Sequence, residues 1–290
     1  MTPEQWQRSG TYAELCGHRI FYRDTTGSKP VLLLLHGFPT SSWDWDLIWD
    51  SLSDRFRLVA FDCLGLGFSD KPRGYDYTVV EQAEIAVQLL RQLSVSDCDV
   101  LAHDYGDTVA QELLARQVDG TDQHLKLHSV CFLNGGLFPE THRARLIQKL
   151  LVSPVGPIFT WLQGRKQFGR SFSAVFGAET QPSKAELDQF WMVVSHADGN
   201  RQLHRLLQYI PERRAQRSRW VGALSETDIP IRVICGVDDP VSGGHMLVRY
   251  RELISNPDIV ELPGIGHYPH TEHPQGVLDA FEAFHTRLQP

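Results

Sequence analysis

Short, almost continuous apolar segments alternate with amphipathic segments along most of this chain. The helical periodicity begins at Thr78, which forms a capping box with Glu81, and it recurs from Tyr105 to Val118. Strands that are apolar throughout and separated by helices are typical of a parallel sheet covered on both faces, so the pattern predicts an α/β fold. The apolar segments predict strands, the first two paired as a hairpin, at 12–16, 19–23, 31–36, 57–62, 98–103, 128–133, 231–236 and 258–262.

The alternation of strands and helices stops in one long segment. Residues 137–223 contain helical patterns, several aromatic residues and the prolines Pro154 and Pro157, but no convincing strand. We interpret this segment as an inserted helical cap, or lid. The core domain is then expected to comprise residues 1–136 and 224–290.

The composition is that of an ordinary globular enzyme. Of the 290 residues, 42% are hydrophobic and 22% are charged, which suits one large domain with an insertion. The net charge of −7 argues against a nucleic-acid partner. Five cysteines without C-x-x-C spacing are expected to be reduced and buried. No charged-then-apolar segment opens the sequence, and the longest apolar run, Val31 to Leu35, is too short to span a membrane, so we expect a soluble, cytoplasmic protein.

The predicted lid differs from the rest of the chain in charge. Residues 141–220 carry 13 Lys and Arg against 5 Asp and Glu, although the whole chain is acidic. One interpretation is a basic surface that attracts an anionic membrane or acidic substrates, centred on Arg213, Arg214, Arg217 and Arg219. The other is that these side chains form ordinary ion pairs with the acidic core. No pattern in the sequence indicates an oligomeric state.

A carboxylate stands where the predicted strand at 98–103 turns into a helix. The small residues Ala102 and Gly106 lie two positions to either side of Asp104. A sharp strand-to-helix turn crowds its flanking backbone, and its serine form has the pattern G-x-S-x-G. A carboxylate at the apex is ionised at neutral pH and displaces a leaving group from a saturated carbon, giving an ester that water must hydrolyse. The alternative is that Asp104 only caps the helix beginning near Tyr105.

A nucleophilic carboxylate needs a general base to activate water in the second step. His267 follows the last predicted strand in a glycine-flanked loop, which can place its imidazole above the sheet. His270 and His273 complete an H-x2-H-x2-H spacing, but Pro269 and Pro274 interrupt a helix there. We therefore predict no metal site and no cofactor.

Two further groups complete this arrangement. Asp238 and Asp239 follow the strand at 231–236, and either of them can orient the imidazole of His267 or simply form a turn. The backbone N–H groups of Tyr105 and of Phe38, in the loop after the strand at 31–36, are the candidate oxyanion hole. An ordinary strand exit is the alternative for the Phe38 loop.

The segments that carry these residues resemble the Asp-nucleophile branch of the α/β-hydrolase superfamily, which holds epoxide hydrolases and haloalkane dehalogenases. They span nearly the whole chain and read LLHGFPTSSWDW, FDCLGLGFSDKP, HDYGDTVAQELL, GVDDPV and GHYPH. The resemblance implies the α/β-hydrolase fold, a nucleophile at Asp104 and, from the family pattern G-x-x-D-P, an acid at Asp239 rather than Asp238. It also implies a cis peptide bond at Phe38–Pro39.

Within this branch, individual side chains favour one reaction over another. Dehalogenases typically carry Trp directly after the nucleophile and often Asn after His-Gly, whereas this chain has Tyr105 and Phe38. Epoxide hydrolases usually protonate the ring oxygen with two lid tyrosines, and the context of Tyr209 is similar to the second of them. The alternative for Tyr209 is packing on the core. The first half of the lid has no tyrosine, so the candidates for a second donor are His142, His196 and His204.

We therefore predict a hydrolase that forms an alkyl ester at Asp104 and hydrolyses it with water activated by His267. An epoxide hydrolase acting on a small apolar organic substrate is the leading interpretation, with haloalkane dehalogenase and esterase as alternatives. His36 and Trp43 are the candidate substrate-binding residues, although Trp43 can equally pack a helix on the sheet. A non-enzymatic alternative is a protein of the same fold that binds lipid or membrane through its basic lid.

Overall fold

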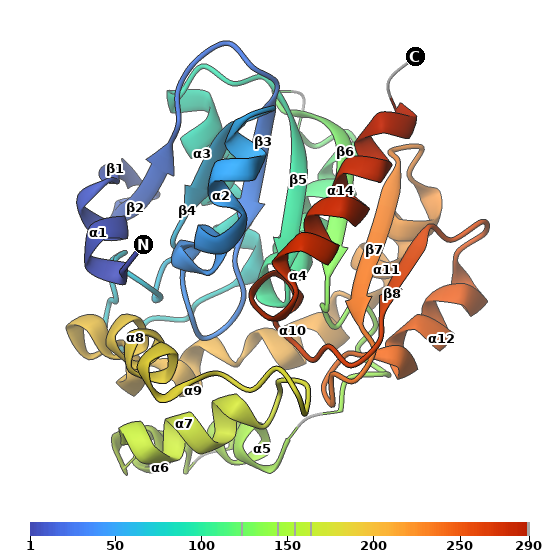
Figure 1. The fold of residues 1–290 in the computed structure, drawn as a ribbon. Coiled ribbons are helices and arrows are strands. Elements are labelled where there is room, and N and C mark those ends of the chain that lie inside the picture. The colour runs from blue at the N-terminus through green and yellow to red at the C-terminus, as the bar shows by residue number, and fades with distance from the viewer. Residues whose placement is uncertain (123, 144, 154, 163, 289–290) are drawn as a thin grey trace.

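An eight-stranded sheet runs through the middle of the molecule (Figure 1). The computed structural model describes residues 1–122, 124–143, 145–153, 155–162 and 164–288. The strand order is β1-β2-β4-β3-β5-β6-β7-β8, and all neighbours are parallel except β1 with β2 and β2 with β4. The strands are β1 (Thr11–Leu15), β2 (His18–Asp24), β3 (Val31–Leu35), β4 (Arg57–Phe61), β5 (Asp97–His103), β6 (Lys126–Leu133), β7 (Ile231–Gly236) and β8 (Ile259–Leu262).

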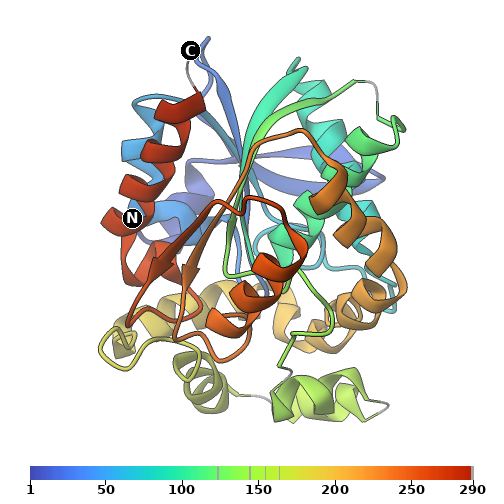
Figure 2. The ribbon, with the colours of Figure 1, turned by 90° about the vertical axis from the view of Figure 1, so that its right-hand side faces the viewer.

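Helices cover both faces of this sheet. Seen along the sheet in Figure 2, α2 and α14 lie on one face, and α3, α4 and α11 lie on the other. The helices are α1 (Pro3–Arg8), α2 (Asp46–Ser53), α3 (Val79–Gln92), α4 (Tyr105–Val118), α5 (Leu146–Val152), α6 (Gly156–Leu162), α7 (Arg165–Ser173), α8 (Lys184–Ser195), α9 (Leu203–Leu206), α10 (Tyr209–Ala215), α11 (Arg217–Glu226), α12 (Gly244–Leu253), α13 (Pro269–Glu272) and α14 (Pro274–Leu288), with 3-10 turns η1 (Ser42–Trp45) and η2 (His196–Arg201).

The predicted α/β architecture is confirmed. All eight predicted strands are present, with ends that differ from the predicted ones by at most two residues. The central strands are apolar throughout because both of their faces are buried, and Leu32–Leu35 and Val100–Ala102 are completely enclosed. Thr78 caps α3 by accepting a hydrogen bond from the backbone N–H of Glu81 at 3.2 Å. Four cysteines are buried as expected, whereas Cys16 is only half-buried.

The chain between β6 and β7 is helical. Helices α5 to α9 lie beyond the carboxyl ends of the strands (Figure 1), and the described part of residues 137–223 contains no strand. Helix α11 packs along α4 on the face of the sheet. The division into a core and a lid with those boundaries stays a prediction. No helix within the described ranges is long and apolar enough to cross a membrane.

The start of α4 lies directly against the end of β3. The backbone N–H of Gly106 donates to the carbonyl oxygen of His36 at 3.1 Å. A Cβ atom on Gly106 would lie only 2.2 Å from the carbonyl oxygen of Leu35. The contact therefore requires a residue without a side chain, which is the physical reason for the small residue two positions after Asp104.

We expect Gly106→Ala to lower the free energy of unfolding by about 2 kcal/mol or more, because the added methyl group collides with backbone that cannot move aside. Urea unfolding followed by circular dichroism measures this change. The matched control is Gly169→Ala within α7, where the nearest atom to a new Cβ is the Leu187 side chain at 3.6 Å. That variant should be neutral or slightly more stable. Equal stability of the two variants would contradict the account.

Candidate active site

Asp104 occupies a sharp turn between β5 and α4. Its φ of 47° and ψ of −102° lie outside the regions that L-residues prefer, and α4 begins at the next residue. The side chain makes no capping hydrogen bond to the helix. Instead, its Oδ2 accepts a hydrogen bond from the backbone N–H of Phe38 at 3.1 Å. The helix-cap interpretation of Asp104 is therefore wrong, and its carboxylate faces the loop that follows β3.

The structure brings Asp104 together with His267 and Asp239. Nε2 of His267 lies 3.9 Å from Oδ2 of Asp104, and Nδ1 of His267 lies 2.8 Å from Oδ2 of Asp239. All three side chains are buried, whereas the neighbouring Asp238 is exposed. They follow β5, β7 and β8, whose carboxyl ends meet at one edge of the sheet. This geometry gives the histidine one carboxylate on each ring nitrogen.

Asp239 is held in place by three donors. The backbone N–H of Val241, the Asn134 side-chain amide and the Ser242 hydroxyl donate to it at 2.7, 3.1 and 3.0 Å. Asn134 and Ser242 are absent from the predicted site. Asn134 directly follows β6, and a polar residue at the carboxyl end of a predicted parallel strand is a signal that sequence inspection can detect.

The ionisation of the three groups is coupled. Burial alone would raise the pKa of Asp104, but His267 and then Arg213 hold the pKa of that carboxyl well below its usual range. Burial would likewise raise the pKa of Asp239, and His267 lowers it. Burial would lower the pKa of His267, yet the carboxylates of Asp239 and Asp104 raise it well above its ordinary value. The resting site therefore holds an imidazolium between two carboxylates.

A second cluster of polar side chains lies behind the loop of His267. Asp44, His103 and His270 are buried, and one nitrogen or carboxylate oxygen of each lies within 4.8 Å of the others. Among the residues that the structure describes, these three could therefore hold a metal ion. Burial lowers the pKa of His103 to about 3 and that of His270 well below its usual value, so both rings are neutral. Nε2 of His103 donates to the carbonyl oxygen of His267 at 2.8 Å. The cluster thus supports the loop of His267, and the sequence did not single out Asp44 or His103.

The loop after β3 carries the first candidate oxyanion donor. The N–H of Phe38 points at the Asp104 carboxylate, and the peptide bond Phe38–Pro39 is cis, as the family resemblance implies. The hydroxyl of Tyr268 donates to the carbonyl oxygen of Phe38 at 3.2 Å, which fixes this loop to the segment after β8. The N–H of Tyr105, in the first turn of α4, remains the predicted second donor.

His36 and Trp43, the predicted substrate-binding residues, do not line the pocket at Asp104 that is described below. His36 is fully buried, where its Nδ1 donates to the Gly37 carbonyl oxygen at 2.8 Å and its Nε2 accepts from the backbone N–H of Cys63 at 2.9 Å. Trp43 packs on Phe190 with 5.1 Å between ring centroids and lines a different pocket. Proximity in sequence to the oxyanion loop does not reveal which way a side chain points, so neither side chain reaches that pocket.

Tyr209 is buried beside Asp104. Its ring centroid lies 4.8 Å from that of Tyr105 and 6.2 Å from that of Phe38. Burial, followed by the charge of Asp104, raises the pKa of Tyr209, so the phenol stays protonated. Its hydroxyl donates to no described residue, whereas that of Tyr268 is already engaged by Phe38. The ring of Tyr209 therefore packs on the core, as the alternative interpretation predicts. Its hydroxyl group is not used as a donor to any described residue.

The three candidate second donors differ in their surroundings. His204 interacts through Nδ1 with the Thr160 hydroxyl at 3.2 Å, and His196 packs edge-on against Phe68. His142 is the one whose ionisation responds to the site, because burial and then Arg213 lower its pKa to about 4 while Asp104 opposes them. Neither these three histidines nor Tyr209 belong to the lining of the pocket described next, although Tyr209 packs on Phe38 and Tyr105 at its edge.

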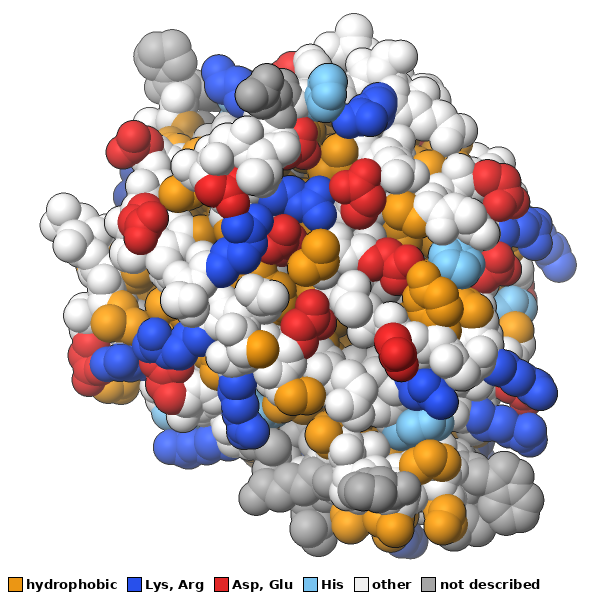
Figure 3. Space-filling view, turned by 180° about the vertical axis from the view of Figure 1, so that it is seen from behind, with side chains coloured by type: hydrophobic (Ala, Val, Ile, Leu, Met, Phe, Trp, Pro, Cys, Tyr) orange, Lys and Arg blue, Asp and Glu red, His pale blue; other side chains and the backbone are white. Residues whose placement is uncertain are grey.

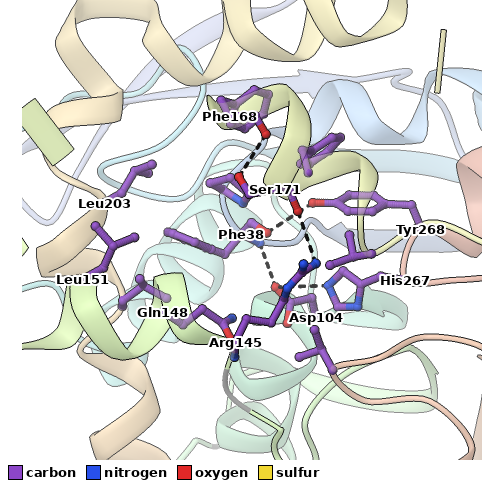
Figure 4. A pocket seen from close by; sticks show the side chains of 15 residues that line it. Phe38, Asp104, Arg145, Gln148, Leu151, Phe168, Ser171, Leu203, His267 and Tyr268 are labelled. Atoms are coloured by element: carbon purple, nitrogen blue, oxygen red, sulfur yellow. Dashed lines mark hydrogen bonds and ion pairs between the residues drawn. The ribbon is translucent and has the colours of Figure 1, made fainter. Parts of the chain in front are cut away.

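A pocket opens above the Asp104 carboxylate and His267 (Figure 4). It encloses about 100 Å³. Its polar members besides Asp104 and His267 include Arg145, Gln148 and Ser171 from the segment around α5 and α7. Its apolar walls include Phe38, Leu151, Phe168, Phe172, Leu203, Leu207 and Tyr268. The pocket therefore suits a small, largely apolar organic molecule.

Arg213 is buried, so the interpretation of the lid charge as an exposed basic surface does not hold for this residue. Its side chain is buried, Nε donates to the Thr108 hydroxyl at 2.7 Å, and Nη2 donates to the carbonyl oxygen of Asp104 at 3.4 Å. Its guanidinium also lies 4.6 Å from the centroid of the Tyr209 ring. Arg213 thus steadies the turn of Asp104 and keeps its carboxylate ionised.

Arg217 and Arg219 form the ion pairs that the second interpretation of the lid charge predicted. Arg217 binds Glu140 at 2.9 Å, and Arg219 binds Glu112 at 2.8 Å and also Asp119. Figure 3 shows basic and acidic side chains interspersed over this side of the molecule. These contacts favour local neutralisation over attraction of an anionic membrane.

Comparison with known proteins adds the family. Residues 32–280 match the model of the "Alpha/beta hydrolase family". The mesoderm-specific transcript protein of Mus musculus is 45% identical over 289 residues, which covers 96% of this chain and 86% of that protein.

Solved structures show the same fold. A loop variant of the haloalkane dehalogenase DbeA from Bradyrhizobium elkanii has a TM-score of 0.81 at 19% identity, covering 97% of each chain. The epoxide hydrolase CorEH has a TM-score of 0.77 at 20% identity, covering 97% of this chain and 99% of that one. The mostly parallel sheet with flanking helices is therefore the α/β-hydrolase fold, as predicted.

We expect Arg213→Met to lower the free energy of unfolding by about 1 to 3 kcal/mol, because Thr108 and the Asp104 carbonyl oxygen lose their buried donors. Thermal and urea unfolding measure the change. Arg214→Met removes the same charge from the next residue, which is exposed, and should shift stability by less than about 0.5 kcal/mol. If the two variants lose the same stability, the structural role of Arg213 is refuted.

Proposed function

The chain belongs to the alpha/beta hydrolase family, and we propose that its nucleophile is the carboxylate of Asp104 and its substrate an epoxide. The observation that carries the proposal is the position of the Asp104 carboxylate at the strand-to-helix turn, 3.9 Å from Nε2 of His267, and the lowered pKa of Asp104 favours its ionised form. A serine at this position would need a base to become nucleophilic, whereas a carboxylate does not. The site is therefore built to attack a saturated carbon.

In the first step, an Asp104 oxygen attacks a ring carbon of the epoxide. The carbon–oxygen bond of the ring breaks, an ester forms at Asp104, and the departing oxygen takes a proton. Tyr209 is the proposed donor because its phenol stays protonated beside Asp104 and its hydroxyl donates to no other residue that the structure describes. The strained ring carries its own leaving group, so no separate halide site is needed.

In the second step, water hydrolyses the ester. His267 takes a proton from the water, whose oxygen attacks the carbonyl carbon of the Asp104 ester, and the N–H groups of Phe38 and Tyr105 stabilise the oxyanion. Collapse releases the diol and restores the carboxylate. Esterification removes one of the two negative charges that raise the pKa of His267, so the imidazolium releases its proton, which restores the phenol of Tyr209. The neutral imidazole is then free to accept the proton of the water.

The alternatives receive less support. Tyr105 has its hydroxyl enclosed beside Tyr209, and Phe38 offers only its backbone, so neither side chain supplies a halide donor. Membrane binding through a basic lid is less well supported, because Arg213 is buried and Arg217 and Arg219 form ion pairs with Glu140 and Glu112. Epoxide hydrolysis in a soluble, cytoplasmic setting, with a small apolar substrate and water as its partners, remains our proposal.

We expect Asp104→Asn to abolish epoxide opening, and His267→Gln to stop after the first step. Since the ester then lacks a base to activate water, mass spectrometry should find the epoxide mass added to the peptide that contains Asp104. The assay uses a panel of aryl and alkyl epoxides, with diol release measured for the wild type. If no member of the panel yields a diol, the proposed substrate class is wrong. If the adduct lies on another residue, the assignment of Asp104 as the nucleophile is wrong.

We expect Asp239→Asn to lower kcat by about a hundredfold or more, because the imidazole loses the group that orients it. The carboxylate of Asp239 raises the pKa of His267, so its removal lowers that pKa. Ester hydrolysis needs the neutral imidazole, and the acidic limb of the pH profile of kcat should therefore move to lower pH. Asp238→Asn, at the exposed neighbour, is the control and should leave kcat and the profile unchanged. A shift of the limb to higher pH would contradict the assignment.

A further inference from the structure

A single guanidinium lies in the wall of the pocket above Asp104. Arg145, the residue immediately before α5, lines this pocket together with Gln148 from the first turn of that helix (Figure 4). Its side chain is partly buried, and Nη1 donates to the carbonyl oxygen of Ser171 at 3.3 Å. This bond fixes the direction of the side chain but leaves its charge uncompensated.

No carboxylate neutralises Arg145. Every Asp and Glu side chain of the sequence falls within the described residues, and none of them forms an ion pair with Arg145. Other arginines of the same region do have such partners, as Arg165 has Asp188 and Arg217 has Glu140. A partly buried cation without a counter-ion is unfavourable in an apolar wall, unless a ligand supplies the anion.

Gln148 adds a second donor beside this cation. Its Oε1 accepts the backbone N–H of Arg145 at 2.9 Å, so its amide NH₂ is the end left free, and it donates to no described residue. Arg145 and Gln148 thus offer a guanidinium and an amide as donors to the same pocket, and a carboxylate has two oxygens that can accept from them. The rest of the wall is apolar, with Leu151, Phe168 and Leu203 among its members.

We propose that the substrate carries a carboxylate, which Arg145 and Gln148 bind while Asp104 attacks a carbon at the other end of the molecule. The inference rests on the proposed function for the reacting end only. The negative charge of Asp104 does not forbid an anionic substrate, because the imidazolium of His267 offsets it. Arg145 is then a specificity residue, which holds the substrate and takes no part in bond breaking.

Binding of unreactive probes tests the proposal independently of turnover. We compare 3-phenylpropionate with 3-phenylpropanamide, which has nearly the same shape without the charge, by calorimetric titration. The wild type should bind the acid about tenfold tighter than the amide or better, since a charge-assisted pair in a partly buried site contributes that much. Arg145→Gln should lose this preference while its affinity for the amide stays the same, which also shows that the pocket is intact.

Arg143→Gln is the matched control, because Arg143 is exposed, lies two residues away and does not line the pocket. It should keep the full preference for the acid. Equal binding of acid and amide by the wild type, a preference that survives in Arg145→Gln, or no binding of either probe would each overturn the proposal.

Turnover of phenylglycidate and of its amide separates this inference from the proposed function. If both hold, the wild type opens the acid with the higher kcat/KM, and Arg145→Gln removes the difference by raising KM for the acid. If neither epoxide reacts but the binding preference depends on Arg145, the epoxide proposal fails and the carboxylate site stands. If both react at equal kcat/KM in the wild type, the carboxylate site fails and the epoxide proposal stands.

Discussion

The site depends on the reversal of the chain at Asp104. The backbone passes from β5 into α4 through a residue with φ of 47°, and this is possible only because Gly106 lets the helix start touch the end of β3. The reversal lifts the carboxylate out of the sheet toward the N–H of Phe38 and the imidazole of His267. A regular helix cap at this position would have directed the same carboxylate into the helix, away from both.

Charge balance is the second requirement. Two buried carboxylates share one imidazolium, and the buried Arg213 donates to the backbone carbonyl oxygen of Asp104. This arrangement keeps Asp104 ionised in an enclosed site, where a lone carboxylate would take up a proton. Because the proposed ester removes one of these charges, the pKa of His267 falls, and its neutral imidazole can then act as a base. One histidine can thus serve both steps without moving.

The fold and the central residues were predictable from the sequence, since they depend on local patterns. Continuous apolar runs mark buried parallel strands, and Asp104, Asp239 and His267 each follow one of these runs, so their meeting at one sheet edge follows from topology. Orientation was not predictable in the same way. Arg213 and Arg214 are adjacent in sequence, and only the packing of α10 shows that the first is buried and the second exposed. The side-chain directions of His36 and Trp43 were unpredictable for the same reason, and so was the place of Arg145 in the pocket wall. Asn134 was predictable in principle, because it follows β6 as the three central residues follow their strands.

The central claim is that an oxygen atom of Asp104 itself enters the product. A single turnover in water labelled with heavy oxygen tests it most directly, with enzyme in excess over an epoxide and both product and Asp104 peptide analysed by mass spectrometry. The account predicts that the first product molecules carry ordinary oxygen from Asp104 and that the peptide gains the heavy oxygen when the ester is hydrolysed at its carbonyl carbon. Heavy oxygen in the product of that first turnover, with an unlabelled peptide, would show direct attack by water and contradict the account.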